Sequence, residues 1–315
     1  MGNLPSRKHG RALSRLATAA IAAALVGGAA GTAVADSPAP PAQDLQKTTA
    51  ATAPRTVTSA PTSQSPADAP RFPLMAVNGT TLYQYWRDGQ GGFADRKAVN
   101  DKWRDITSAV LVDLDQDGLA EGHYFRTLDG SLYYIRGGKN ENDPVVQKRI
   151  GGGWNIYNRI TSPGNLGGAN QADLIARDQA GVLWLYLAYP DGTLSDRIRV
   201  GAGWDQFTDI VGRGDLNGDS KADIVAKDRD GVLWFYKGTG DSKDPFESRV
   251  KVGSGWDTYN MLVATGDVDG DNRSDLLARD KSGVLWLYRG NGNATDPFEN
   301  RTKIGGGWDQ YSTMF

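Results

Sequence analysis

The feature of this sequence that most constrains its fold is a repeat of about fifty residues. Tryptophan recurs at intervals of 51, 50, 52 and 52 residues, at Trp103, Trp154, Trp204, Trp256 and Trp308. A second marker runs in phase with the first, as TLYQY, SLYYI, VLWLY, VLWFY and VLWLY at residues 81–85, 131–135, 182–186, 232–236 and 284–288. Both markers occur five times, so the sequence predicts five equivalent structural units.

The residues within one unit have a β pattern. Short β-branched and aromatic runs, such as ADIVAKD and VLWFYKG, alternate with turns rich in Gly, Asp and Pro, and no helical period is present. Four such runs fit into each unit. Four strands in about fifty residues are typical of one blade of a β-propeller. We therefore expect an all-β fold, a five-bladed β-propeller of four-stranded blades.

The two ends of the repeat region predict how the ring closes. The chain stops at residues 311–315, where earlier units begin the strand that leads into an acidic loop, and the pattern starts at Phe72, just after the place of such a loop. We therefore expect the C-terminal strand to complete the first blade and the termini to replace a fifth acidic loop. Closure of this kind leaves no unpaired sheet edge in water.

The composition divides the chain into three parts. Residues 1–35 combine four basic residues with an Ala-rich apolar run and end in Ala33-Val34-Ala35, which predicts a cleaved secretory signal peptide. Residues 36–70 are mostly Pro, Ala, Thr, Ser and Gln and predict a disordered linker. Residues 71–315 contain the repeats and are the expected propeller. The protein is therefore expected to be secreted and extracellular, with no membrane insertion after cleavage.

Charge and cysteine content exclude several functions. The chain has 35 Lys and Arg against 37 Asp and Glu, and loss of the four basic residues in the predicted signal leaves 31 against 37, a net charge of −6. An acidic chain gives no electrostatic reason to expect nucleic acid or an anionic membrane as partner. Cysteine is absent, which excludes disulfides, thiol catalysis and zinc–thiolate sites.

Acidic loops recur within the repeats. In DVDGDNRSD at residues 267–275, carboxylates stand at positions one, three, five and nine, and Arg273 at position seven can offer its backbone carbonyl. Alternating oxygen donors on a tight loop suit Ca²⁺, which takes six to eight oxygen ligands. The spacing recurs in two further loops, so about three Ca²⁺ sites are expected, with these candidate ligands: Asp113, Asp115, Asp117, Glu121, Asp215, Asn217, Asp219, Asp223, Asp267, Asp269, Asp271, Arg273 and Asp275.

Three other interpretations of these loops are less consistent with the sequence. An EF-hand requires an acid at position twelve, where this chain has Tyr124, Ala226 or Ala278, and its flanks would be helices. Plain Asp/Gly turns do not explain three matches in register with the repeat. Magnesium prefers rigid octahedral sites that keep several waters. The third unit retains one carboxylate, at Asp173, so we expect no metal there.

The motif DxDGDxxxD, followed by a strand pair such as DLLARDxxGVLWLY, resembles the FG-GAP or VCBS repeat of integrin α-subunit propellers and of many secreted bacterial proteins. The resemblance covers nearly all of residues 71–315 and is specific in four units. It implies that the loops are calcium sites joining the first two strands of a blade. The blade number differs, because integrin propellers have seven. Five-bladed closure is also similar to tachylectin, a sugar-binding propeller, although the motifs match poorly.

The residues favour binding over catalysis. The only histidine after residue 35 is His123, expected at an exposed loop exit, and no Gly-x-Ser-x-Gly motif is present. We expect no enzymatic activity and a monomeric module that binds an extracellular glycan or cell-envelope component. Protein–protein adhesion is the alternative, and a glycoside hydrolase with two carboxylates comes third. The mid-strand tryptophans are expected in the core, whereas those of the GxGW motifs suit either packing or ligand contact.

Overall fold

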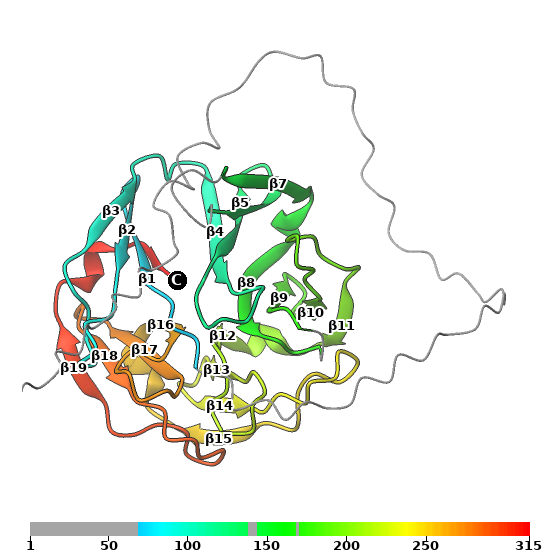
Figure 1. Ribbon diagram of the computed structural model, residues 1–315. Coiled ribbons are helices and arrows are strands. Elements are labelled where there is room, and N and C mark those ends of the chain that lie inside the picture. Colours follow the sequence, from blue (N-terminus) through cyan, green and yellow to red (C-terminus); the bar gives the residue numbers. More distant parts are fainter. Residues whose placement is uncertain (1–68, 138–143, 168–169) are drawn as a thin grey trace, which may run out of the picture.

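The computed structural model describes residues 69–137, 144–167 and 170–315. The predicted signal peptide and all but the last two residues of the predicted linker lie outside the described residues. The described chain forms five antiparallel sheets of four strands each, arranged as the blades of a ring (Figure 1). The expected five-bladed β-propeller is confirmed.

The strands of the blades have the following bounds. Blade one is made of β20 (Thr313–Met314), β1 (Leu74–Asn78), β2 (Thr81–Tyr85) and β3 (Lys97–Asn100). Blade two is made of β4 (Ile106–Val112), β5 (Gly122–Thr127), β6 (Leu132–Arg136) and β7 (Val146–Gly151). Blade three is made of β8 (Tyr157–Gly164), β9 (Asp173–Asp178), β10 (Leu183–Tyr186) and β11 (Ile198–Gly201). Blade four is made of β12 (Phe207–Val211), β13 (Ile224–Asp228), β14 (Leu233–Tyr236) and β15 (Val250–Gly253). Blade five is made of β16 (Tyr259–Gly266), β17 (Asp275–Asp280), β18 (Leu285–Tyr288) and β19 (Thr302–Gly305).

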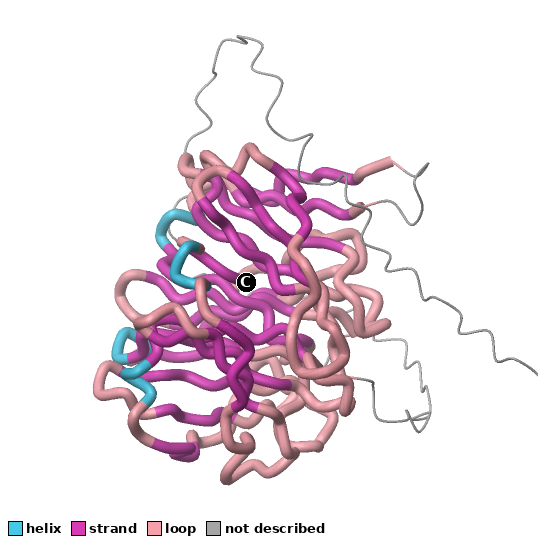
Figure 2. The backbone as a smooth tube through the Cα atoms, turned by 90° about the vertical axis from the view of Figure 1, so that its left-hand side faces the viewer, coloured by secondary structure: helices cyan, strands magenta, loops and turns pink. Residues whose placement is uncertain are grey.

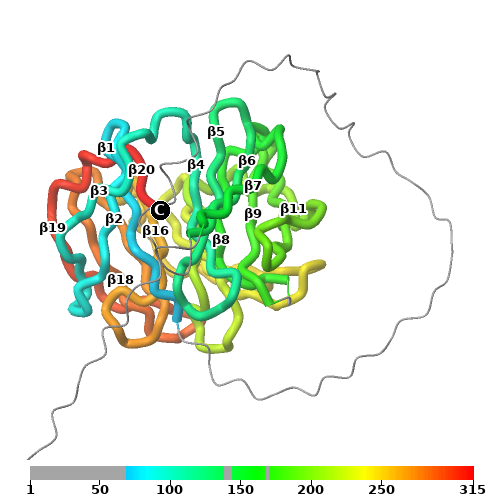
Figure 3. The backbone as a smooth tube through the Cα atoms, turned by 45° about the horizontal axis from the view of Figure 1, so that its top comes forward, coloured from blue at the N-terminus to red at the C-terminus, as the bar shows by residue number. Residues whose placement is uncertain are grey.

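The ring closes between the two ends of the repeat region. Strand β20 pairs antiparallel with β1, in a register that places Met314 opposite Ala76 and Thr313 opposite Val77. Figure 3 shows the last, red part of the chain beside the blue strand β1 near the centre of the ring. The prediction that the C-terminal strand completes the first blade is therefore confirmed.

Each of the four GxGW motifs forms one turn of 3₁₀ helix just before the inner strand of a blade. These turns are η1 (Trp154–Ile156), η2 (Trp204–Gln206), η3 (Trp256–Thr258) and η4 (Trp308–Gln310), and they lie along one side of the ring (Figure 2). The glycine before each tryptophan has a φ of 79° to 88°, which a residue with a Cβ adopts only under strain. We call this side of the ring the corner face. The inner strands end at the opposite face, in the acidic loops.

The GxGW tryptophans are packed between blades. The four are only 7–8% exposed, as is Trp103, which recurs at the equivalent position without the motif. Trp204, for example, contacts the rings of Phe207, Tyr236 and Phe246 and belongs to a cluster that includes Leu183 of the preceding blade. The question left open by the sequence is thus decided for packing, since a buried ring offers no surface for a ligand.

The mid-strand tryptophans are less buried than expected. Trp184, Trp234 and Trp286 are half-buried, and an exposed arginine covers each ring: the guanidinium carbons of Arg197, Arg249 and Arg301 lie 4.2, 4.0 and 4.2 Å from the ring centroids. Each indole also donates a hydrogen bond to an aspartate carboxylate at a hairpin, at Asp178, Asp228 and Asp280. Each ring thus lies at the edge of the core: it packs against a hydrophobic cluster and is covered by a cation on its outer side.

The chain enters the ring across the face opposite the corner face, where the acidic loops lie. The amide of Ala69 donates to the side-chain oxygen of Asn272, the Pro70 carbonyl accepts from Asp267, and the Arg71 amide donates to the Gly118 carbonyl. Ala69 and Pro70, assigned to the linker from the sequence, are therefore docked on the propeller. Within the described residues no helix has the length and apolarity needed to cross a membrane.

Candidate metal-binding loops

The acidic loops of blades two, four and five share one internal hydrogen-bond pattern. The carboxylate at position one accepts the backbone N–H groups of positions four and six, over 2.5–3.2 Å, in the pairs Gln116 and Gly118 to Asp113, Gly218 and Ser220 to Asp215, and Gly270 and Asn272 to Asp267. Positions four and six both have positive φ in every loop, between 59° and 91°. This geometry curls each loop around its first carboxylate.

The carboxylate at position nine ties each loop to its sheet. It accepts the N–H of position two in all three loops, in the pairs Leu114 to Glu121, Leu216 to Asp223 and Val268 to Asp275, over 2.6–2.9 Å. Asp223 and Asp275 also accept an N–H from the second residue after the third strand, Gly238 and Gly290 respectively. Burial raises the pKa of both aspartates to about 7. Position nine is thus a buried acid held by backbone donors.

Among the acidic loops, the loop of blade two has the least compensated negative charge. Carboxylate oxygens of Asp113, Asp115 and Glu121 lie within 4.8 Å of one another, and no ion pair with a side chain of the described residues compensates these three acids. The second oxygen of Glu121, Oε2, is buried without a hydrogen-bond partner. Burial raises the pKa of Glu121 to about 8 and that of Asp113 to about 6. Such a set fits a divalent cation well, because the ion would give Oε2 a partner.

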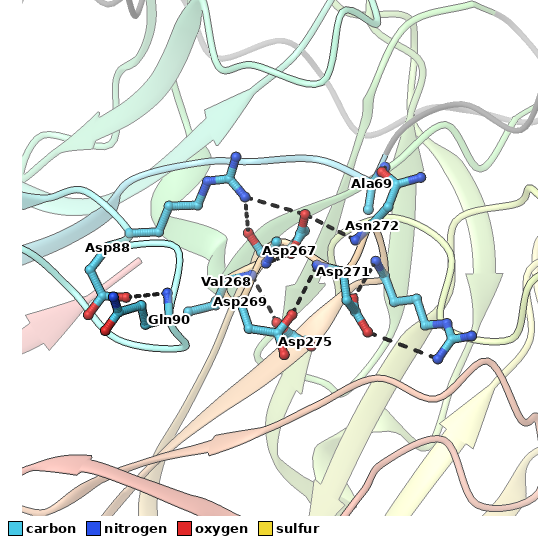
Figure 4. A network of polar contacts seen from close by, with 12 residues as sticks. Ala69, Asp88, Gln90, Asp267, Val268, Asp269, Asp271, Asn272 and Asp275 are labelled. Carbon is cyan, nitrogen blue, oxygen red and sulfur yellow. Dashed lines mark hydrogen bonds and ion pairs between the residues drawn. The ribbon is translucent and has the colours of Figure 1, made fainter. Parts of the chain in front are cut away.

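The loop of blade five brings together Asp267, Asp269 and Asp271, again within 4.8 Å (Figure 4). Here three arginines lie beside the acids, with distances of 3.3 Å from Arg87 to Asp267, 2.7 Å from Arg289 to Asp269 and 4.0 Å from Arg273 to Asp271. The side chain of Arg273 therefore pairs with a candidate ligand, in addition to any role of its carbonyl. A cation at this site would compete with these guanidinium groups.

The loop of blade four is intermediate. Asp215, Asn217, Asp219 and Asp223 keep the spacing, but the side-chain amide of Asn217 donates to Asp223 over 2.8 Å and so presents nitrogen to that carboxylate. Lys237 lies 3.5 Å from Asp219. The acids of this loop do not form a cluster like those of blades two and five.

The loop of blade three lacks the carboxylates at positions one, three and five but keeps the buried aspartate at position nine, Asp173. Asp173 is fully buried and accepts N–H groups from Leu166, Gly167 and Ala188, and the first and third of these bonds correspond to those that position nine makes in blades four and five. Since this bonding occurs without the other acids, position nine has a structural role in blades three, four and five, and ligation of a metal would be an additional one.

The basic neighbours of the loops were not predicted, although the sequence contains a signal for them. In the blades with an acidic loop, Lys237 and Arg289 directly follow the third strand and Arg136 is its last residue, whereas Leu187 stands at this position in blade three. The prediction that His123 is exposed at a loop exit is wrong. His123 lies in β5, only 6% exposed, and burial lowers its pKa to about 4.

The fold and its loops define a five-bladed β-propeller with acidic loops between the first two strands of three blades. The FG-GAP-like repeat family model matches residues 215–278, which include the acidic loops of blades four and five. The repeat and the five blades together support an FG-GAP β-propeller. The sequence-based resemblance to this repeat is confirmed for the matched segment.

Solved structures with a similar course of the chain have low sequence identity. A mutant of AofleA from Arthrobotrys oligospora is 10% identical, with 78% of this chain and 74% of that chain covered and a TM-score of 0.43. BBS1N in complex with ARL6DN is 14% identical, with 73% and 64% covered and a TM-score of 0.36. Prp20p from Saccharomyces cerevisiae is 9% identical, with 72% and 59% covered and a TM-score of 0.36. The chain thus spans less than two thirds of the latter two. No curated protein sequence matches the chain.

Proposed function

We propose that this protein is an exported, non-catalytic binding module whose propeller is stabilised by Ca²⁺. The observation that carries the calcium part is the loop of blade two, where three acids converge and Glu121 Oε2 is buried without a partner. Carboxylates so arranged repel one another unless a cation or protons neutralise them. Calcium suits a flexible all-oxygen loop better than magnesium does, because Mg²⁺ retains several waters and requires strict octahedral geometry.

Calcium binding is tested by titration calorimetry on protein stripped with a chelator, and by thermal unfolding with Ca²⁺ and with EGTA. Extracellular calcium modules have dissociation constants of about 10⁻⁴–10⁻³ M, so each site occupied at 10 mM Ca²⁺ should add about 1.4–2.7 kcal/mol to the free energy of unfolding. Magnesium at the same concentration is the control. Heat-neutral titration together with superimposable melting curves in Ca²⁺ and EGTA would remove the calcium part of the proposal.

The ligand part of the proposal concerns extracellular or cell-envelope glycans. Four blades present an exposed arginine stacked on a half-buried aromatic ring, as Arg96 on Tyr83, Arg197 on Trp184, Arg249 on Trp234 and Arg301 on Trp286. Next to three of these pairs are tyrosine hydroxyl groups, at Tyr311, Tyr157 and Tyr259. Guanidinium donors, hydroxyls and ring edges suit sugar hydroxyls, and repetition around a ring lets weak sites act together.

A glycan array with the full-length protein in Ca²⁺ tests the ligand part. We expect binding that free sugar releases, and a weaker signal when Arg249 is replaced by alanine, because one of four equivalent sites is lost. Lys251→Ala is the matched control, since Lys251 is an exposed cation two residues from Arg249, on strand β15. A blank array, combined with pull-down of an envelope protein that sugar does not release, would favour adhesion. Turnover of chromogenic glycosides would contradict the non-catalytic part.

A further inference from the structure

A cavity of about 220 Å³ lies on the axis of the ring. Its walls come from the inner strands of all five blades, β20, β4, β8, β12 and β16, together with Trp103 and Arg126. The volume equals that of about seven water molecules in the liquid. It adjoins a pocket of about 470 Å³ on the corner face, because the two share Arg159, Leu262, Thr313 and Met314 in their linings. The axial cavity therefore has a neighbouring opening on that face.

The lining of this axial cavity is cationic. It includes Arg126, Arg159 and Arg213, with hydroxyl groups from Thr107, Ser108, Thr161 and Thr313, and it contains no aspartate or glutamate. Arg126 and Arg159 stand near the corner face, since Arg126 donates to the carbonyl oxygens of Trp154 and Tyr157 and Arg159 to that of Thr208. Arg159 also lies 3.5 Å from Asp209, whereas Arg213 forms no ion pair with any described residue.

Arg213 is the unusual member of this group. It is only 6% exposed, it donates one hydrogen bond of 2.8 Å to the Leu111 carbonyl, and its guanidinium lies 4.2 Å from the ring centroid of Phe72. Its Nε–H group is buried without a hydrogen-bond partner, as is that of Arg159. The carboxylate of Asp113 acts on Arg213 electrostatically but forms no ion pair with it. A buried cation without a direct ion pair and with an unpartnered Nε–H group is costly, which favours an anion beside it.

The sequence repeat shows that the fold itself does not require this arginine. The residue two positions before the acidic loop is Pro163 in blade three and Thr265 in blade five, where blade four has Arg213. Likewise Arg159 corresponds to Asp209 in blade four and Met261 in blade five. Residues that differ between equivalent positions of the blades and line the cavity on the shared axis can contribute to one central site.

We propose that the axial cavity binds one small oxyanion, a carboxylate or phosphate-like group that enters from the corner face past Arg126 and Arg159 and is held at Arg213. A guanidinium group donates two parallel hydrogen bonds to such oxygens, and the threonine and serine hydroxyls can complete the shell. The anion would be either a free ion or the carboxylate of an acidic sugar. Although Arg213 lies near Asp113, none of the residues lining the cavity is a candidate Ca²⁺ ligand or one of the surface arginines, so the site stands or falls independently of the proposed function.

The test compares sodium sulfate, sodium acetate and sodium glucuronate with sodium chloride at equal ionic strength, with thermal unfolding and titration calorimetry of the full chain as readouts. We expect at least one oxyanion to bind with a stoichiometry of one and to raise the melting temperature above its value in chloride. Glucuronate binding at least tenfold more tightly than acetate would identify an acidic sugar as the source, and equal affinities would identify a free anion.

Two variants decide whether Arg213 holds the anion. Arg213→Thr introduces the residue that blade five carries at this position and should weaken binding at least tenfold, whereas Lys303→Met removes an exposed cation on β19 and should change nothing. Sulfate stabilises proteins in general by exclusion from their surface, so an equal rise in melting temperature in wild type and Arg213→Thr would overturn the proposal. If Arg213→Thr does not fold, ¹⁵N-arginine NMR of the wild type replaces it. An Nε–H resonance of Arg213 that oxyanions leave unmoved would equally contradict the site.

Discussion

Arg279 in β17 donates a hydrogen bond of 2.7 Å to the carbonyl oxygen of Tyr311, and so joins the fifth blade to the strand that closes the ring. The same guanidinium nitrogen also donates to the Trp308 carbonyl. Equivalent cations make the same link at three other interfaces, as Arg126 to Tyr157, Arg177 to Phe207 and Lys227 to Tyr259. Val77 stands at this position in blade one. The link from the first to the second blade therefore lacks a cation.

Replacing Arg279 by methionine should weaken ring closure. Arg279 is 8% exposed, and its loss leaves two inter-blade carbonyl groups without a donor. We expect the free energy of unfolding to fall by about 2–3 kcal/mol. Denaturant unfolding measures this change, with Lys303→Met as an exposed control that should stay within about 0.5 kcal/mol of wild type. Equal stability of the two variants would show that the link contributes little.

Replacing Asp115 by asparagine should abolish one calcium site without affecting the metal-free protein. Asp115 is exposed and belongs to the acid cluster of blade two. We expect the calorimetric stoichiometry to fall by one, while the melting temperature in EGTA stays unchanged or rises, because one repulsive charge is lost. Asp196→Asn, at an exposed position in blade three, is the control. An unaltered stoichiometry would place the ion elsewhere.

Replacing Asp173 by alanine should destabilise the propeller and leave calcium binding as it is. The substitution removes the acceptor of three backbone N–H groups in a loop where no metal is expected. We expect a loss of at least about 3 kcal/mol in the free energy of unfolding. Asp275→Ala is the informative comparison, because it should lower both the stability and the number of calcium ions bound. A drop in stoichiometry for Asp173→Ala would show that blade three also binds metal.

In EGTA, His123 should contribute a loss of stability that grows as the pH falls from 6.5 to 4, opposed by the buried acids Glu121, Asp223 and Asp275, whose pKa is raised. Burial lowers the pKa of this histidine to about 4 in the folded protein, whereas the unfolded chain keeps a value near 6.5. The unfolded state therefore binds the proton first as the pH falls, at a cost to folding of about 1–2 kcal/mol by pH 5. His123→Leu places there the residue found at Leu174 and Leu276 in the same register. The difference in stability between pH 6.5 and pH 5 should then be smaller in this variant than in wild type, and an unchanged slope would contradict the assignment.

Much of the candidate metal site was accessible from the sequence, because its donors lie within nine consecutive residues. The spacing of Asp267, Asp269 and Asp271 along the chain brings their side chains close together, whatever the position of the loop in the fold. The partners of these acids come from far away in the chain: Arg87 is 180 residues from Asp267. No spacing rule relates them, so which acids are compensated by arginine, and which are left for a cation, required the structure.

The sequence by itself determined the five blades, their four strands and the closure by the last strand, because a repeat of turns and alternating apolar residues specifies local structure and each blade must bury the same face. The tertiary structure decided how exposed each repeated side chain is and what faces the axis. Trp204 is buried and Trp234 is half-buried, although the sequence repeats both tryptophans equally regularly in blades three, four and five. Arg213 contacts the inner strands of other blades only when the ring is closed. This contact depends on the curvature of the whole assembly of sheets, which no short stretch of residues encodes.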